Sequence, residues 1–202
     1  AMGRRSYSSY CGGLAAGNTN WQRLADVLFG AFNPSGKLTM SFPRHVGQCP
    51  IYYNRYNTGR PTGGNGVFWS HYTDESNDPL YPFGFGLSYT QFAYDKLQVT
   101  VEAGKRVLVT VDVTNVGKRV GEEVSQLYLH DKVASVARPV KELKGFQKYS
   151  LEPGETQKLE FVLTPEELGY YNNQGEFVVE AGSFSVMVGT NSQQGLWADF
   201  EW

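Results

Sequence analysis

The sequence has little cysteine and little histidine, which limits the kinds of site it can form. Among 202 residues there are two cysteines, Cys11 and Cys49, and three histidines. No CxxC pair occurs, and no histidine stands at metal-ligand spacing, so neither a disulfide scaffold nor a zinc site is indicated. Nothing beyond their even number favours a bridge between the two cysteines. We therefore expect no metal and no cofactor.

The chain also lacks an excess of either charge and any long apolar run. Its 18 Lys and Arg against 20 Asp and Glu give a net charge of −2, so no electrostatic attraction to nucleic acid is expected. No stretch approaches the roughly 18 apolar residues that a membrane-spanning helix needs. The N-terminal residues show no apolar region of the signal-peptide type. We predict neither a nucleic-acid partner nor a membrane partner.

Glycine, proline and aromatic side chains are abundant instead. Charged residues make up 19% of the chain, below the usual ~25%. The 23 Gly and 9 Pro together make up about 16%, above the usual ~12%. This composition is typical of short strands joined by many turns. At roughly 150 residues per domain, the length predicts one complete domain and part of another.

Residues 1–42 are predicted to hold one short helix and one strand. The apolar residues between Trp21 and Phe29 recur with the spacing of one helical face, and Gly30 stands where a C-cap is expected. After a turn, apolar and polar residues alternate from Leu38 to Phe42 as in a half-buried strand. Because a helix and a lone strand cannot close a core, we interpret this part as the last αβ element of a larger α/β domain.

Residues 43–86, which we call the connector, have no sustained period and are rich in glycine and aromatic residues. A segment of about forty residues without regular structure is normally either functional or disordered. The aromatic density argues against disorder, because these side chains would otherwise lie in water. We predict that the connector packs as an extended strap across a neighbouring domain.

From residue 87 onward, apolar and polar residues alternate with the period of two that is typical of strands with one buried face. Turn sequences at 115–117, 152–155, 172–175 and 181–182 separate the strands. Residues 87–202 are therefore predicted to form a mainly β, immunoglobulin-like antiparallel sandwich of about seven strands, with at most a helical turn at 165–168. The residues expected in its core are Val109, Val111, Leu127, Leu129, Phe161, Leu163, Val186 and Val188.

One of these strands is ambiguous. Around Leu127 and Tyr128 both parities are apolar, so the sequence alone does not decide which side chain faces inward. A strand covered on both faces would explain the pattern.

A catalytic role finds little support in the residues present. Asp74 and Glu75 are adjacent carboxylates, whereas cleavage of a glycosidic bond needs two carboxyl groups on opposite sides of that bond, ~5 Å or ~6.5–9.5 Å apart. We expect one of them to accept hydrogen bonds from backbone amides and to order the loop instead. The histidines His45, His71 and His130 lack a nearby nucleophile signature and are interpreted as packing or surface residues.

Binding is a second chemistry that the connector offers. Aromatic rings pack well against the faces of sugar rings, and ligand pockets combine such rings with a few polar groups. The candidate substrate-binding residues are Tyr53, Trp69, Tyr72 and Asp74. In the alternative, which we favour, the aromatic residues anchor the connector on its neighbouring domain.

Several motifs carry a family resemblance in their order and spacing. They are Ala25-Asp-Val-Leu-Phe-Gly30, Asn33-Pro-Ser-Gly-Lys-Leu38, Ser41-Phe-Pro-Arg44, Ile51-Tyr-Tyr-Asn54, Tyr81-Pro-Phe-Gly-Phe-Gly-Leu-Ser-Tyr-Thr90 and Arg138-Pro-Val-Lys-Glu-Leu-Lys-Gly-Phe146. From Leu24 to Trp202 the chain resembles the C-terminal portion of glycoside hydrolase family 3, the β-glucosidase and β-xylosidase type.

The resemblance implies a domain order of (β/α)₈ barrel, α/β sandwich and fibronectin type III-like domain. Residues 1–42 would then be the end of the α/β sandwich, 43–86 the connector, and 87–202 the fibronectin type III-like domain. Residues 1–20 depart from the family pattern. The family's nucleophilic Asp and acid/base Glu lie upstream of the helix at Ala25–Gly30, and no residue here matches either, so we assign no catalytic residue.

The function implied is that of a non-catalytic C-terminal fragment of a retaining exo-β-glycosidase, inactive alone, which supports the catalytic domains. Those domains would be its partners, with a β-linked glucoside or xyloside as substrate of the parent enzyme. The family resemblance suggests a periplasmic or secreted parent, and the exposed remnant surface favours a homo-oligomer. Two alternatives stay open: a stand-alone carbohydrate-binding or adhesion module, and a protein–protein interaction module, because fold does not fix function.

Overall fold

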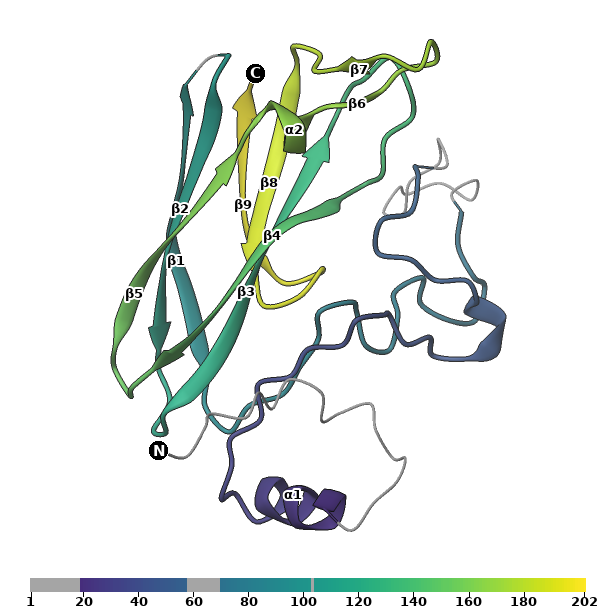
Figure 1. Ribbon diagram of the computed structural model, residues 1–202. Coiled ribbons are helices and arrows are strands. Elements are labelled where there is room, and N and C mark those ends of the chain that lie inside the picture. Colours follow the sequence, from purple (N-terminus) through teal and green to yellow (C-terminus); the bar gives the residue numbers. More distant parts are fainter. Residues whose placement is uncertain (1–18, 58–69, 103) are drawn as a thin grey trace.

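The main body of the protein is a sandwich of two antiparallel sheets, seen in a computed structural model that describes residues 19–57, 70–102 and 104–202 (Figure 1). One sheet has three strands in the order β1-β2-β5, and the other has four in the order β4-β3-β8-β9. This confirms the mainly β class and the predicted sandwich of about seven strands. The strands are β1 (Phe92–Glu102), β2 (Arg106–Asn115), β3 (Gly121–Asp131), β4 (Glu142–Leu151), β5 (Thr156–Leu163), β8 (Ser183–Gly189) and β9 (Gly195–Glu201).

The core lies between the two sheets. In one sheet Val109 pairs with Phe161, and in the other Leu127 pairs with Val188, so alternation turns each of these side chains inward. All the residues predicted for the core are buried there. The full buried cluster comprises Val107, Val109, Val111, Val113, Leu127, Leu129, Leu151, Leu159, Phe161, Leu163, Leu168, Phe184, Val186, Val188 and Phe200.

Strand β3 is covered on both faces, which accounts for its ambiguous pattern. Leu127 belongs to the core cluster, whereas Tyr128 is fully buried outside it, on the outer face of the four-stranded sheet. A break in register with β4 falls between these two residues. The connector supplies the cover over Tyr128, as described below.

Helices are few and short among the described residues. The predicted N-terminal helix is present as α1 (Thr19–Leu28), followed by Gly30 at a φ of 76°. The single turn expected near Pro165 is present as α2 (Pro165–Leu168). The remaining short elements are the 3₁₀ turn η1 (Val46–Gln48) and the two-stranded sheet of β6 (Tyr170–Tyr171) and β7 (Phe177–Val178).

The strand predicted from Leu38 to Phe42 is wrong. This segment runs beside residues 80–85, and its regular pairing is reduced to an isolated antiparallel bridge between Phe42 and Tyr81. The alternating pattern needs a continuous partner strand to become a ladder. The structure provides only scattered backbone bonds here, such as that from Leu38 N–H to the carbonyl of Phe85 at 2.8 Å.

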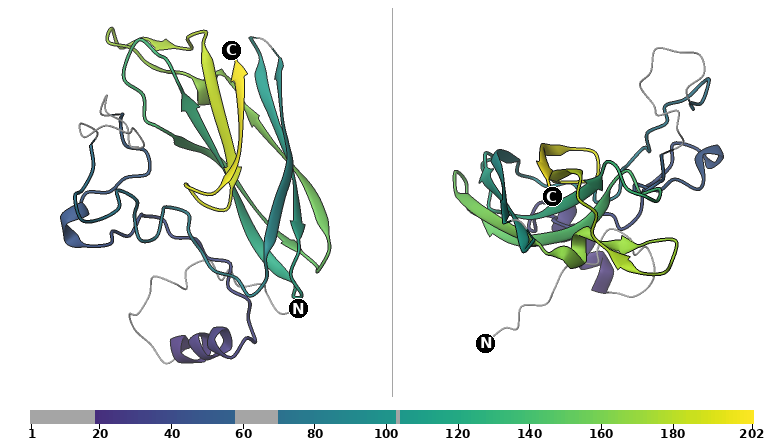
Figure 2. Two further views of the ribbon diagram at one scale, coloured as in Figure 1. Left: turned by 180° about the vertical axis from the view of Figure 1, so that it is seen from behind. Right: turned by 90° about the horizontal axis from the view of Figure 1, so that it is seen from above.

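The described part of the connector lies to one side of the sandwich, and α1 lies beyond one end of its strands (Figures 1 and 2). Side-chain bonds join the connector and the segment before it to β3. Gln126 bonds to the connector on the outer face of the sheet, whereas Lys37 reaches Glu123, which has the inward parity of Leu127. Within the described residues, no helix combines the length and apolarity needed to cross a membrane.

Candidate functional site

An aromatic stack attaches the connector to the outer face of the four-stranded sheet. The ring of Tyr53 stacks on Phe83 with 4.3 Å between centroids and meets Tyr128 edge-on at 5.7 Å. Its hydroxyl accepts a long hydrogen bond of 3.4 Å from the backbone N–H of Leu143. Tyr53 therefore anchors the connector on the sandwich itself, whereas the sequence predicts packing across a neighbouring domain.

A buried ion pair makes a second attachment. The Lys37 ammonium lies 3.0 and 3.1 Å from the two carboxylate oxygens of Glu123 on β3, and both side chains are largely buried. Burial raises the pKa of the Glu123 carboxyl, and the Lys37 ammonium together with the Tyr94 hydroxyl opposes that rise. Removing one partner of a buried pair typically costs about 3–5 kcal/mol, because the remaining charge is left buried without a partner.

The third attachment is a close approach of the connector backbone to β3. Gly84 has a φ of 79°, and a Cβ added to it would lie 2.0 Å from the side-chain oxygen of Gln126. Only glycine fits both conditions. The approach lets Gln126 donate from its amide to the carbonyls of Gly84, at 3.2 Å, and Thr190, at 2.8 Å.

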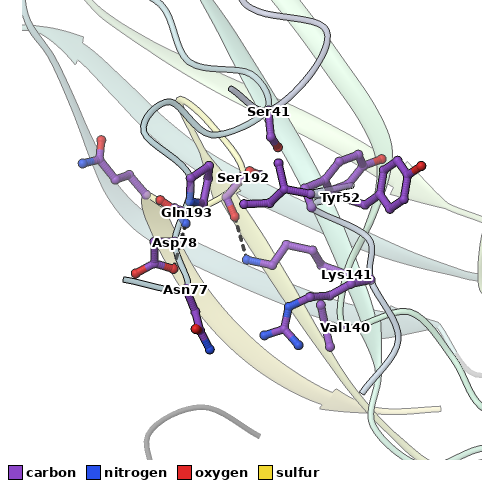
Figure 3. A pocket seen from close by; sticks show the side chains of 13 residues that line it. Ser41, Tyr52, Asn77, Asp78, Val140, Lys141, Ser192 and Gln193 are labelled. Atoms are coloured by element: carbon purple, nitrogen blue, oxygen red, sulfur yellow. Dashed lines mark hydrogen bonds between the residues drawn. The ribbon is translucent and has the colours of Figure 1, made fainter. Parts of the chain in front are cut away.

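Between these attachments the connector and the sandwich enclose an open cleft of about 500 Å³ (Figure 3). In the close view, Lys141 points across the cleft to the backbone of Ser192, while Asp78 and Gln193 meet on the far wall. The volume falls in the range of about 300–1,000 Å³ that is usual for small-molecule sites. The cleft is lined by Ser41, Ile51, Tyr52, Tyr53, Arg55, Asn77, Asp78, Pro79, Val140, Lys141, Ser192, Gln193 and Gln194.

The structure does not gather the predicted sugar-binding residues in this cleft. Tyr53 lines it, but Tyr72 and Asp74 do not, and Trp69 lies outside the described residues. Tyr72 is held within the connector, where its hydroxyl donates to the carbonyl of Gly47 at 3.4 Å. Asp74 is exposed. A sugar contact by any of these residues stays a prediction.

The adjacent carboxylates behave as the loop-ordering interpretation expects. Glu75 accepts a 2.8 Å hydrogen bond from the backbone N–H of Ser76 and lies 3.6 Å from the Arg44 guanidinium. Nowhere in the described ranges do three or more His, Cys, Asp or Glu residues form a group that could hold a metal ion. The arrangement supports loop structure rather than acid–base chemistry.

Sequence reasoning missed the charged residues of the cleft. Lys141 belongs to the motif Arg138–Phe146, which contributes only to the family resemblance, and β4 begins one residue later, at Glu142. Arg55 and Gln193 stand in no recognisable motif. Only tertiary contact over long sequence separations, 51 residues for Lys141 and Ser192, brings these groups together.

A large share of the exposed apolar side chains belongs to α1 and the segments around the connector. Trp21 is 72% exposed and Phe29 is 89% exposed. Soluble monomers rarely leave contiguous apolar surface of this kind in water. Others in the same part of the chain are Leu24, Leu28, Met40, Phe42, Val46, Tyr52, Tyr56, Leu80, Tyr81, Leu87 and Tyr89.

Two families match successive parts of the chain. Residues 9–89 match the family described as Glycosyl hydrolase family 3 C-terminal domain. Residues 123–192 match the family described as Fibronectin type III-like domain. The predicted boundaries of 1–42, 43–86 and 87–202 stay predictions beside these matches.

Curated relatives with glycosidase names are similar to the chain over most of its length. It is 47% identical over 191 residues to a periplasmic beta-glucosidase of Salmonella typhimurium and 46% identical over 189 residues to a beta-xylosidase of Formosa agariphila. Each match covers 92% of this chain but 25% of the relative. The chain thus spans about a quarter of the length of these curated relatives.

Solved structures agree in fold. A beta-glucosidase from Listeria innocua, in complex with isofagomine, matches with a TM-score of 0.82 and 45% identity, covering 88% of this chain and 26% of that one. A GH3 beta-glucosidase of Bifidobacterium adolescentis matches with a TM-score of 0.72 and 34% identity, covering 90% of this chain and 28% of that one. The sandwich, the flanking helix and these matches together place the chain in glycoside hydrolase family 3, of which it carries the C-terminal portion with its fibronectin type III-like domain.

Proposed function

We propose that the chain is the non-catalytic C-terminal part of a retaining exo-β-glycosidase and that its role is structural. In this role the sandwich is a rigid support, and α1 with the connector packs on the catalytic domains of the parent enzyme. The parent would hydrolyse a β-linked glucoside or xyloside.

The observation that carries this proposal is the exposed apolar surface of α1 and of Phe29, which follows it. Side chains as large as Trp21 and Phe29 lie in water, although the helix has the amphipathic pattern of one that covers a core. The relatives that the chain matches are about four times longer, and their additional length would supply the covering surface.

The mechanism of support follows from the three attachments on β3. The Tyr53 stack and the Gly84–Gln126 approach fix the connector to the sheet, and the Lys37–Glu123 pair fixes the segment just before it. A face presented by α1 would then dock against the catalytic domains without a large loss of conformational freedom. The sandwich contributes rigidity, and the helix contributes the contact.

Mixing two chains tests the proposal. The Salmonella typhimurium relative, shortened by the quarter that matches this chain, is combined with the 202-residue protein, and release of nitrophenol from an aryl β-glucoside is measured. We expect neither chain alone to exceed the buffer blank and the mixture to do so. Turnover by the 202-residue chain alone would overturn the proposal.

Paired variants locate the contact. Trp21→Ser combined with Phe29→Ser should reduce the activity of the mixture at least tenfold by weakening association. Val162→Ser is the control. Val162 is an exposed apolar residue too, at 47%, but it lies on β5 in the other sheet, away from α1. If the control reduces activity as much as the helix variant, α1 is not the docking face.

A further inference from the structure

Two cations line the cleft, Lys141 and Arg55. Among the described residues, neither Lys141 nor Arg55 forms an ion pair, although both line the same cavity. The Lys141 ammonium donates to the carbonyl of Ser192 at 2.6 Å and lies 5.4 Å from the ring centroid of Trp197. These contacts hold the ammonium in place without neutralising it.

The electrostatic setting of Lys141 is unfavourable for a cation. Burial lowers the pKa of the Lys141 ammonium, and the neighbouring Arg55 lowers it further, while Asp78 acts in the opposite direction. Two like charges that face one cavity repel each other, and an anion between them would remove that repulsion. The carboxylate of Asp78 is itself engaged, since it accepts from the Gln193 amide at 3.1 Å.

The remaining walls suit a hydroxylated molecule. Tyr52 is 64% exposed and offers a flat apolar face. The amides of Asn77 and Gln193 each donate one hydrogen bond, to the carbonyl of Ser70 at 2.7 Å and to Asp78 at 3.1 Å, and each keeps a second N–H for a ligand. Aromatic faces pack on the C–H surface of a sugar ring, and amides can both donate to and accept from hydroxyl groups. The cleft thus combines stacking, neutral hydrogen bonding and positive charge.

We propose that this cleft binds a small hydroxylated carboxylate, such as a hexuronate, with its carboxylate between Lys141 and Arg55 and its ring beside Tyr52. The cleft wall carries two cations, Lys141 and Arg55, and one carboxylate, Asp78, so its net charge is +1. This charge is balanced by a monoanion, whereas a phosphate carries about −1.5 to −2. The guanidinium of Arg55 can donate two parallel hydrogen bonds to the carboxylate. This binding requires no catalytic group.

Calorimetric titration of the 202-residue protein with sodium glucuronate tests the proposal, at neutral pH and low ionic strength. Glucose and inorganic phosphate are titrated in parallel as controls. Glucose has the sugar ring without the carboxylate, and phosphate has negative charge without the ring. We expect glucuronate to bind at least tenfold more tightly than either. Raising the salt concentration should weaken its binding.

Arg55→Gln should weaken glucuronate binding at least tenfold, and because Arg55 is exposed this variant is expected to keep the fold, checked by circular dichroism. Lys141→Met serves as a second variant with the same expected loss. Lys158→Gln, an exposed lysine on β5, is the matched control and should bind as the unaltered protein does. The proposal fails if glucose or phosphate binds as tightly as glucuronate, or if Arg55→Gln leaves glucuronate affinity unchanged.

Discussion

Tyr53 joins the connector to the sandwich with one half-buried ring. Tyr53→Ala would remove the stack on Phe83 and uncover Tyr128. We expect a loss of about 2 kcal/mol in the free energy of unfolding, the order expected when an aromatic side chain of this burial is truncated. Urea denaturation followed by tryptophan fluorescence measures it.

Tyr56→Ala is the matched control for that measurement. Tyr56 lies three residues further along the connector and is 60% exposed, so its truncation should change stability by less than about 0.5 kcal/mol. Equal losses in the two variants would contradict an anchoring role for Tyr53.

Residue by residue, the sequence predicts inward positions well and outer-face contacts poorly. Val109 and Phe161 follow from alternation within their own strands, because the pleat alone decides which face a side chain takes. The burial of Tyr128 depends on Tyr53, a residue 75 positions earlier that no local pattern connects to it. The same holds for the cleft, whose charged groups come from three separate loops.

A capping box formed by Thr164 and Glu167 stabilises the N-terminus of the short helix α2. The backbone N–H and the hydroxyl of Thr164 both donate to one carboxylate oxygen of Glu167, each at 2.6 Å. Burial acts to raise the pKa of Glu167, but these hydrogen bonds outweigh it, and the pKa is lowered. A lowered folded-state pKa stabilises the fold above the ordinary pKa of Glu, and this contribution is lost as the pH falls through the folded-state value.

Glu167→Gln should therefore lower the free energy of unfolding by about 1 kcal/mol at pH 7, and by progressively less as the pH falls below the ordinary pKa of Glu, ~4.3. Urea denaturation at several pH values measures the difference. Glu166→Gln makes the same change of charge at an exposed neighbour and should have little effect. A difference between Glu167→Gln and the unaltered protein that is constant with pH would contradict the capping role.

The element that sequence reasoning misjudged illustrates a general limit. Residues 38–42 alternate as a strand does, yet Met40 is 62% exposed and a bridge at Phe42 is all the regular pairing present. Alternating apolar and polar residues indicate that one face of a segment can be buried. A hydrogen-bonded ladder also requires a neighbouring strand of matching length. The helix α1 needs no such neighbour for its hydrogen bonds, and its position was predicted within two residues.

For the molecule as a whole, the exposed apolar side chains favour self-association. We expect light scattering to detect a dimer or larger species whose fraction rises with protein concentration. Trp21→Ser combined with Phe29→Ser should shift the population toward the monomer. Removing residues 1–86 is a harsher variant, because it also uncovers Tyr128 and Gln126 on the sheet. A monodisperse monomer at high concentration would contradict this expectation.

Backbone hydrogen bonds join the two ends of the loop between Phe42 and Tyr81. The N–H of Phe42 donates to the carbonyl of Tyr81, and the N–H of Leu80 donates back to the carbonyl of Phe42, each at 2.8 Å. Doubling the length of a loop with fixed ends adds only about 0.6 kcal/mol to its closure cost. A change of length between Phe42 and Tyr81 that leaves Tyr53 on the sheet would therefore add little to the closure cost, which makes this loop a site where inserted or grafted segments can be carried.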